Sequence, residues 1–166
     1  MKVNIALLTV TDTRTIDNDK SGGILVSKIK ESNHNLIDRK ICKDDKDQIV
    51  FILKDWLKVE KIDVIITTGG TGLTGRDITP EALNEVAEKH IPGFGEIFRN
   101  ISIKTVGTSA IQSRACAVLS NGKYIFALPG SSGGVTDAWE GILKHQLDIN
   151  HKPCNFVELF PRLKEK

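Results

Sequence analysis

The densest group of residues that could bind a ligand is Thr67–Gly75, which reads TTGGTGLTG. Glycine lets the backbone approach a ligand closely and adopt positive φ angles. Successive N–H groups in such a loop form a nest for an oxyanion, and Thr68, Thr71 and Thr74 add hydroxyl donors. A tight turn that binds nothing would explain a single Gly-Gly pair. Four glycines within seven residues, interleaved with threonine, favour an anion-binding loop.

Asp77 follows this loop and is its most informative charged residue. An acid beside an anion site raises repulsion unless a cation intervenes, and Mg²⁺ held by carboxylates and substrate phosphates is the usual solution. The structural alternatives are that Asp77 caps the helix expected at Thr79 or pairs with Arg76. Asp44 and Asp45 precede another helix, where capping is the simpler explanation, although they also follow a strand.

Two familiar glycine motifs fit the loop only formally. Gly70–Gly75 matches G-x-G-x-x-G, but a dinucleotide-binding loop opens directly into a helix, and here the helix is expected only at Thr79. The acidic residue that such a site needs would be Glu96, which falls on a predicted helix. The loop also has P-loop spacing, but Arg76–Asp77 stands where Lys–Ser/Thr is required. The sequence therefore argues against NAD binding and against a P-loop NTPase.

The composition is that of one globular domain. The chain has 166 residues, 40% of them hydrophobic and 27% charged, and we expect a single domain with its core at about 3–150 and an irregular tail at 151–166. A net charge of +2, with acids and bases interspersed, gives no general case for binding nucleic acid or a membrane. Three widely spaced cysteines form no C-x-x-C and indicate thiols in a reducing cytoplasm.

Strands and helices alternate along the chain and would position these loops. Val3–Val10 and Asp63–Thr68 are apolar runs typical of strands covered on both faces, while Leu36–Ile41 is more polar and suits a sheet edge. Asn121–Gly122 joins two further strands as a predicted hairpin. The sequence therefore predicts a three-layer α/β/α sandwich with a mostly parallel sheet.

The helices have recognisable beginnings. Ser21 can cap the first helix, and Asp45 with Gln48 resembles a capping box for the second. Thr79 is the expected cap of the third helix, on whose apolar face we place His90.

Three loops follow apolar strands with small polar residues: Thr9–Thr13, Thr68–Gly75 and Pro129–Gly133. Ligands in open α/β sheets bind beyond the carboxyl ends of the strands, so these loops would meet at one edge if the strands are parallel neighbours. Ser113–Arg114 could present a cation to a phosphate there, or could be an ordinary surface pair.

The order and spacing of seven motifs resemble the MoaB/MogA family of molybdopterin-binding domains over nearly the whole chain. The motifs are Leu8-Thr-Val-Thr-Asp12, Asp19-Lys-Ser-Gly22, Thr67-Thr-Gly-Gly-Thr-Gly72, Arg76-Asp-Ile-Thr-Pro-Glu-Ala82, Pro92-Gly-Phe-Gly-Glu96, Thr108 through Ser113-Arg-Ala115, and Leu128-Pro-Gly-Ser131. The ending Lys152-Pro-Cys-Asn-Phe156 resembles the B-type branch.

The resemblance implies a function in molybdenum cofactor biosynthesis. Active members transfer adenylyl from ATP to the terminal phosphate of molybdopterin, need Mg²⁺, and assemble as trimers or hexamers; other proteins of the pathway are possible partners. It implies that Asp77 and Asp44 are catalytic and bind Mg²⁺. The substrate-binding residues it implies are Thr11, Asp12, Ser21, Gly22, Thr68, Gly69, Gly70, Thr71, Gly72, Thr74, Ser113, Arg114, Pro129, Gly130 and Ser131.

One alternative concerns activity. Some B-type members lack the Arg-Asp step and are inactive, so a molybdopterin-binding or carrier protein is the second hypothesis. This chain has Gly75-Arg-Asp77, which is closer to the active pattern. Asp45 stands beside Asp44, so either could supply the second carboxylate.

Overall fold

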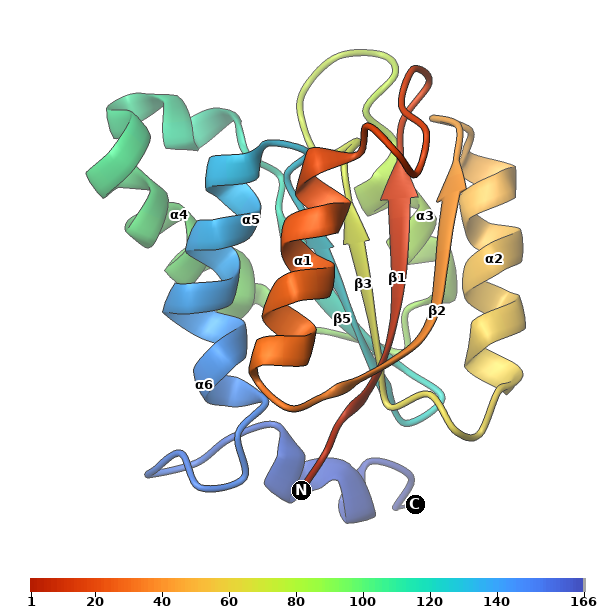
Figure 1. Ribbon diagram of the computed structural model, residues 1–166, viewed down its shortest axis with the longest axis vertical. Coiled ribbons are helices and arrows are strands. Elements are labelled where there is room, and N and C mark those ends of the chain that lie inside the picture. Colours follow the sequence, from red (N-terminus) through yellow and green to blue (C-terminus); the bar gives the residue numbers. More distant parts are fainter. Residues whose placement is uncertain (166) are drawn as a thin grey trace.

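A computed structural model describes residues 1–165, and a six-stranded sheet lies between two layers of helices (Figure 1). The strand order is β2-β1-β3-β6-β5-β4; the first four strands are parallel, and the last two pair antiparallel. The predicted α/β sandwich with a mostly parallel sheet is confirmed. The strands are β1 (Asn4–Val10), β2 (Asn35–Cys42), β3 (Val64–Thr68), β4 (Lys89–His90), β5 (Cys116–Ser120) and β6 (Lys123–Leu128).

The sheet separates two hydrophobic cores because successive side chains of a strand point to opposite faces. In β1, Ile5 and Leu7 join one core, and Ala6 and Leu8 join the other. All four side chains are fully buried. This is why the strand reads as an unbroken apolar run in the sequence.

Helices α1, α4 and α5 cover one face of the sheet, and α2 and α3 cover the other (Figure 1). A π-helical turn and a last short helix continue α5 without a break. The helices are α1 (Lys20–Glu31), α2 (Lys46–Lys58), α3 (Thr79–Val86), α4 (Pro92–Val106), η1 (Gly107–Gln112), α5 (Ser132–Ala138), η2 (Trp139–Leu143), α6 (Lys144–Gln146) and η3 (Val157–Arg162). Within residues 1–165, no helix is long and apolar enough to cross a membrane.

Both edges of the sheet are short or polar. β2 forms one edge, as its composition predicts, and carries Asp38, Arg39 and Lys40. The two-residue β4 forms the other edge. Its His90 was expected on the third helix, and that expectation was wrong: α3 ends at Val86. His90 instead pairs with β5, shortly before a proline that disfavours helical backbone in the residue preceding it.

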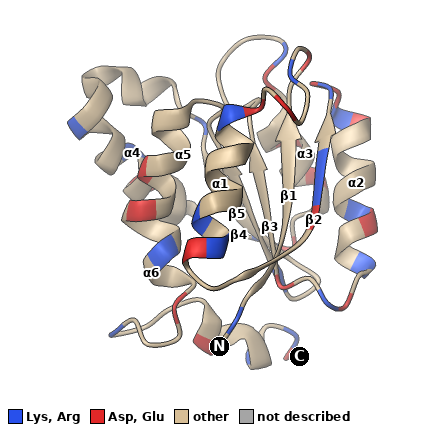
Figure 2. Ribbon diagram, in the orientation of Figure 1, with Lys and Arg blue, Asp and Glu red and all other residues tan. Residues whose placement is uncertain are grey.

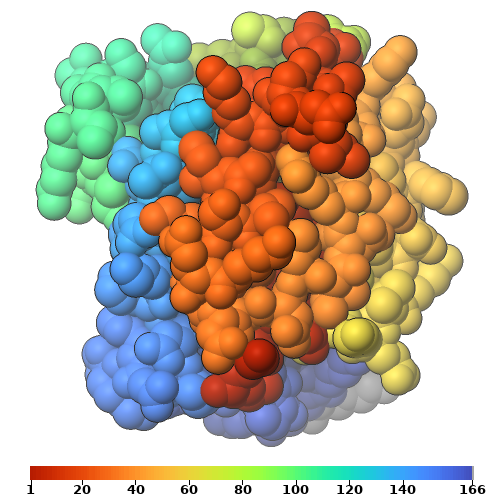
Figure 3. Space-filling model, in the orientation of Figure 1, coloured from red at the N-terminus to blue at the C-terminus, as the bar shows by residue number. Residues whose placement is uncertain are grey.

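The hairpin between β5 and β6 is confirmed. Asn121 and Gly122 have φ angles of 46° and 69°, as a two-residue turn between twisted strands requires. The tail covers the lower end of the molecule (Figure 3). Its Phe156 and Phe160 pack against Tyr124 of β6, with ring centroids 4.6 and 5.7 Å away. It contains the helical turn η3, although the sequence predicts an irregular segment.

Candidate functional site

The candidate site lies at the carboxyl ends of the parallel strands, which we call the rim. β2 lies on one side of β1 and β3 on the other, so the chain reverses its direction of winding between β1 and β3. Such a switch point is where doubly wound sheets bind ligands. β6 is the next neighbour of β3, so the loops after β1, β3 and β6 meet here as predicted. β1 and β3 carry no charged residue, whereas the loops above them do (Figure 2).

The loop after β3 needs glycine for both conformation and space. Gly69 has φ 103°, and a Cβ there would lie 2.2 Å from the carbonyl oxygen of Val10. Gly70 has φ 67°. Within residues 1–165, the N–H groups of Gly70 and Thr71 donate no hydrogen bond. These two amides are therefore free to receive an oxyanion, as expected of a nest.

The glycine loop is joined to the loop after β6. The Thr68 hydroxyl donates to the Pro129 carbonyl at 2.7 Å, and the Gly69 N–H donates to the Leu128 carbonyl at 3.0 Å. A Cβ at Gly130 would lie only 3.3 Å from the Gly69 Cα. The Thr68 hydroxyl is thus already used to hold two loops together, and Thr68 shapes the site instead of offering a free donor.

Asp77 turns back onto the glycine loop. Its carboxylate accepts hydrogen bonds from the Thr74 hydroxyl at 2.7 Å and the Thr74 N–H at 2.9 Å. Burial alone would raise the pKa of Asp77, but these bonds hold that pKa below its usual value, so the carboxylate is ionised. Neither structural alternative is correct, because Arg76 pairs with Asp12 and no side chain caps α3. Thr79 was expected to cap α3, but its hydroxyl donates to the Gly69 carbonyl at 2.8 Å.

The structure distinguishes Asp44 from Asp45. Asp45 is the N-cap of α2 and accepts from the Gln48 N–H at 2.9 Å, which confirms this half of the predicted capping box. The Asp45 N–H donates to the Lys43 carbonyl at 2.8 Å instead of to the Gln48 side chain. Asp44 is left facing the glycine loop, with its Oδ1 3.3 Å from where a Cβ on Gly70 would be. Burial raises the pKa of Asp44, and the carboxylates of Asp12 and Asp77 raise it further.

Asp12 forms an ion pair across the rim with Arg76. The Arg76 Nε lies 3.0 Å and its Nη2 2.7 Å from the Asp12 Oδ2. This pairing lowers the pKa of Asp12. The Asp12 Oδ1 also accepts from the Asp44 N–H at 3.2 Å, so the pair connects the loops after β1, β2 and β3.

Arg114 supports the glycine loop from behind. Its Nε donates to the Gly72 carbonyl and its Nη2 to the Asp77 carbonyl, both at 2.7 Å, and its guanidinium pairs with Glu81. Its own N–H donates to the Thr71 carbonyl at 2.9 Å. The arginine fork thus holds the loop backbone in place, and a contact between Arg114 and a phosphate stays a prediction. Sequence reasoning missed the role of Glu81, although its place in the first turn of α3 was visible.

Asp19 organises the start of α1. It is the N-cap in place of the predicted Ser21, and its side chain accepts from the Gly22 N–H at 3.0 Å. The fully buried carboxylate also accepts from the Thr9 hydroxyl at 2.6 Å and from Arg39 Nη2 at 3.1 Å. Burial alone would raise the pKa of Asp19, but these bonds lower it.

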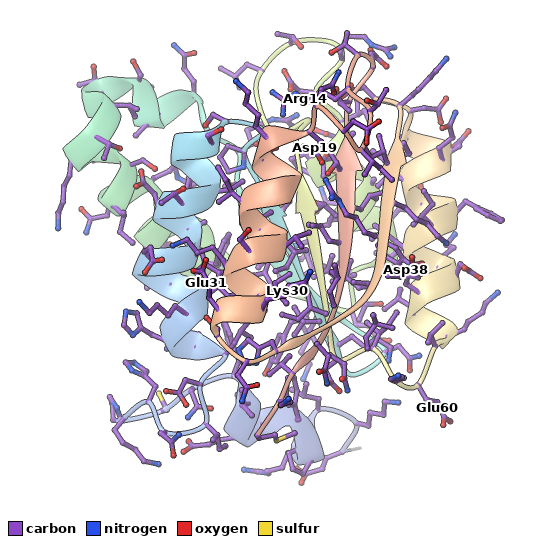
Figure 4. The ribbon with its side chains drawn as sticks, viewed as in Figure 1. Arg14, Asp19, Lys30, Glu31, Asp38 and Glu60 are labelled. Carbon is purple, nitrogen blue, oxygen red and sulfur yellow. The ribbon has the colours of Figure 1, made fainter. Side chains whose placement is uncertain are left out.

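Arg14 connects this network to the third loop. It lies beside Asp19 (Figure 4), and its Nη1 donates to the Ser21 hydroxyl and the Gly130 carbonyl, each at 3.1 Å. Thr11 shapes the same loop by accepting from the Thr13 N–H at 3.3 Å. No sequence pattern indicates this role for Arg14, because a single arginine in a polar loop matches no motif.

The third loop ends at Ser131, which caps α5 by accepting from the Gly134 N–H at 3.1 Å. A hollow of about 380 Å³ opens beside it, between α4, η1 and α5. Pro129 and Ser113 also line this hollow. Its size is in the range of small-molecule sites.

The residues present fit a magnesium ion that is shared with a substrate. In the part of the chain that the structure describes, no three His, Cys, Asp or Glu residues form a ready-made metal cluster. Mg²⁺ bound with a nucleotide needs only one or two protein carboxylates, because phosphates and water supply the other ligands. Asp44, whose negative charge is opposed by burial and by two other carboxylates, would be relieved by such a cation.

The fold and the rim define a doubly wound α/β domain with its site at the switch point. The chain belongs to the family described as "Probable molybdopterin binding domain", whose model matches residues 6–149. It is 41% identical over 161 residues to Molybdenum cofactor biosynthesis protein B of Escherichia coli, covering 97% of this chain and 93% of that protein. It is 46% identical over 149 residues to the protein of the same name from Staphylococcus aureus, covering 88% of each.

Solved structures agree with this assignment. A crystal structure of Molybdenum cofactor biosynthesis protein B superposes with a TM-score of 0.89 at 36% identity, covering 100% of this chain and 98% of the other. The tungsten cofactor synthesizing protein MoaB from Pyrococcus furiosus gives a TM-score of 0.78 at 33% identity, covering 87% and 92%. The family resemblance inferred from the sequence motifs is confirmed.

Proposed function

We propose that the protein acts in molybdenum cofactor biosynthesis as a cytoplasmic molybdopterin adenylyltransferase. The terminal phosphate of molybdopterin attacks the α-phosphorus of ATP; a new oxygen–phosphorus bond forms, and the bond to pyrophosphate breaks. The observation that carries the proposal is the pairing of two unlike carboxylates over the glycine loop. Asp77 is held ionised by Thr74, and Asp44 faces the same loop under charge repulsion.

The residues of the rim suit a transfer between phosphates. Such reactions depend on positioning and charge neutralisation and require no nucleophile from the protein. The free amides of Gly70 and Thr71 would receive the phosphate of molybdopterin. Bound Mg²⁺ would neutralise charge on the nucleotide phosphates, and Asp77 and Asp44 are the residues placed to hold it.

The second candidate is a molybdopterin-binding or carrier protein without catalytic activity. It is supported by the names of the relatives, of which those from Escherichia coli and Staphylococcus aureus specify biosynthesis but no reaction. Against it, a similar structure from Thermus thermophilus, with 29% identity and a TM-score of 0.76, is called a molybdopterin biosynthesis enzyme.

One assay separates the two candidates. The protein is incubated with molybdopterin, ATP and Mg²⁺, and adenylyl-molybdopterin and pyrophosphate are quantified by chromatography. We expect both products in equal amounts, and none when Mg²⁺ is removed with EDTA. Saturable molybdopterin binding without product, from protein shown to be folded, would contradict the transferase and leave the carrier.

We also propose that the chain forms a homo-oligomer, a trimer or a hexamer. The outer side of α4 and η1 exposes several large apolar side chains, and patches of this kind mark association surfaces. They are Ile97, Ile103, Val106 and Ile111, with Ile111 83% exposed. Sedimentation equilibrium should give three or six times the mass of the chain; a monomer at micromolar concentration would contradict this proposal.

A further inference from the structure

Four arginines stand at or under the rim, and three of them are committed to partners inside the fold. Arg114 holds the Gly72 and Asp77 carbonyls and pairs with Glu81. Arg39 binds the fully buried Asp19 carboxylate. Arg14 donates to the Gly130 carbonyl and the Ser21 hydroxyl. Each of these three would leave a polar group of the fold without its partner if it turned towards a ligand.

Arg76 differs from these three because it holds no buried group: its ion pair with Asp12 joins two exposed loop residues. Its side chain is 66% exposed, and its only side-chain partner in residues 1–165 is Asp12, which is itself 38% exposed. Solvent screens this exposed bidentate pair, so phosphate oxygens that offer the guanidinium equivalent charge-assisted bonds can offset the loss of Asp12. Its backbone N–H donates to the Thr74 hydroxyl at 3.3 Å, which lies within the same loop.

The surroundings of Arg76 suit it to bind an anionic ligand. Asp12 raises its pKa most, and Asp44 and Asp45 add to the effect, so the guanidinium lies among carboxylates. It follows the glycine loop directly and precedes Asp77. A triphosphate that enters this acidic rim needs cations on both sides, and a planar guanidinium offers two parallel donors to phosphate oxygens.

We propose that Arg76 binds the polyphosphate of the incoming nucleoside triphosphate, and that Asp12 holds Arg76 in place while no nucleotide is bound. Nucleotide binding exchanges the partner of the guanidinium from a carboxylate to a phosphate. The identity of the nucleotide rests on the proposed function. The assignment of Arg76 rests on its position beside the glycine loop and on its exposed ion pair with Asp12.

The test uses the magnesium complex of α,β-methylene-ATP, which cannot transfer its adenylyl group, titrated into the full-length protein in a calorimeter. Arg76→Gln should weaken binding by about tenfold or more, the effect expected for loss of a charge-assisted bidentate contact. Arg76→Lys should recover part of the loss. Binding of molybdopterin and the melting temperature should stay as in the unmodified protein, because the Asp12 pair is exposed.

Two matched controls sharpen the result. Arg162 is 68% exposed and paired with Glu165 far from the rim, so Arg162→Gln removes the same charge and should change nothing. Lys43 is an exposed cation that also acts on Asp12, and Lys43→Gln tests a second source of charge at the rim. An equal loss with either control, or none with Arg76→Gln, would overturn the proposal.

Asp12→Asn tests the exchange itself. If Asp12 competes with phosphate for Arg76, its removal should leave affinity for the analogue unchanged or raise it by a few fold. A tenfold loss would show that the ion pair persists in the complex, and it would overturn the exchange.

Failure of the inference and failure of the proposed function look different. Triphosphate binding that depends on Arg76, without formation of adenylyl-molybdopterin, would contradict the transferase and support the arginine contact. If the Arg76→Gln variant forms product at the unmodified rate and binds the analogue with unchanged affinity, the transferase is supported and the arginine contact is contradicted.

Discussion

Each end of the sheet holds a charged side chain that is at least partly buried, Lys123 at one end and Asp44 at the other, and their surroundings differ. At the amino ends of the parallel strands, the buried Lys123 Nζ donates to the carbonyls of Val59 at 3.0 Å and Ile62 at 2.5 Å. At the rim, the carboxylates of Asp12 and Asp77 repel the charge of the partly buried Asp44, and Arg76, which attracts it, is paired with Asp12. The charge of Lys123 is therefore stabilised by hydrogen bonds within the protein, whereas the charge of Asp44 would be stabilised by a bound cation.

This difference indicates which end of the molecule serves stability and which serves function. A buried polar group with its hydrogen bonds satisfied supports one fold, whereas a like-charge cluster costs stability and persists where a ligand relieves it. Substitutions at the two ends should therefore separate: those at Lys123 should lower the free energy of unfolding, and those at the rim should lower turnover.

The largest effect is expected for Asp77→Asn. The amide keeps the shape of the side chain and can still accept from Thr74, but it loses the negative charge that would hold Mg²⁺. We expect kcat to fall by about 10²–10³, with molybdopterin affinity nearly unchanged. Steady-state kinetics and a separate binding titration measure the two quantities. Equal losses in both would assign Asp77 to substrate binding instead of catalysis.

Lys123→Met tests the opposite end. The substitution leaves the carbonyls of Val59 and Ile62 buried without a donor, and we expect a loss of about 2 kcal/mol in the free energy of unfolding. Urea denaturation measures it. Lys58→Met, at an exposed position in the last turn of α2, is the matched control and should cost less than about 0.5 kcal/mol. A fall in kcat with either variant at 25 °C would contradict the assignment of stability to this end of the sheet and of function to the rim.

Thr74→Val should have an intermediate effect. It removes the hydroxyl that donates to the Asp77 carboxylate at 2.7 Å, so the pKa of Asp77 should rise. The fraction of ionised Asp77 then falls as the pH drops, and the acid limb of the rate profile should move to higher pH. We expect up to about a tenfold loss in rate on that limb, with Thr74→Ser restoring the original profile. An unshifted pH–rate profile would show that the Thr74 hydroxyl does not control the ionisation of Asp77.

The smallest expected effect is the change in the free energy of unfolding caused by Asp44→Asn. Because the folded protein raises the pKa of Asp44, the ionised carboxylate opposes folding above that pKa, and the penalty disappears once it is protonated in acid. The neutral amide should therefore raise the free energy of unfolding at neutral pH, by at most about 0.5 kcal/mol, while activity is lost. Parallel denaturation at pH 7 and pH 4 checks this, and destabilisation at pH 7 would contradict the charge repulsion at the rim.

The parts of the fold that could be read from the sequence are those set by local pattern. The apolar run of β1, the Asn121–Gly122 turn and the Asp45 cap depend on a few neighbouring residues and are confirmed. The two-residue β4 was missed because it depends on Leu119 and Val118, far along the chain. The Asp19 cap is local, since it accepts from the Gly22 N–H, but Ser21 two residues later is an equally suitable capping residue in the sequence.

The site shows the same division. The sequence indicates which loops meet, because strand ends and glycines are local signals. It does not show that Asp12 pairs with Arg76 across 64 residues, or that Arg114 turns to backbone carbonyls instead of to a ligand. Ion pairs between loops are set by tertiary geometry, and no spacing rule predicts them.

The edges of the sheet have a consequence for how copies of this chain can associate. An open edge strand invites pairing with another molecule and leads to aggregation when the strand is long, flat and apolar. Here one edge has two residues, and the other carries Asp38, Arg39 and Lys40, with Asp38 also bound by the Trp56 indole at 2.9 Å. Strand-to-strand extension is therefore disfavoured at both edges. Any assembly is left to the helical surfaces, and the sheet is protected from fibre formation without being closed into a barrel.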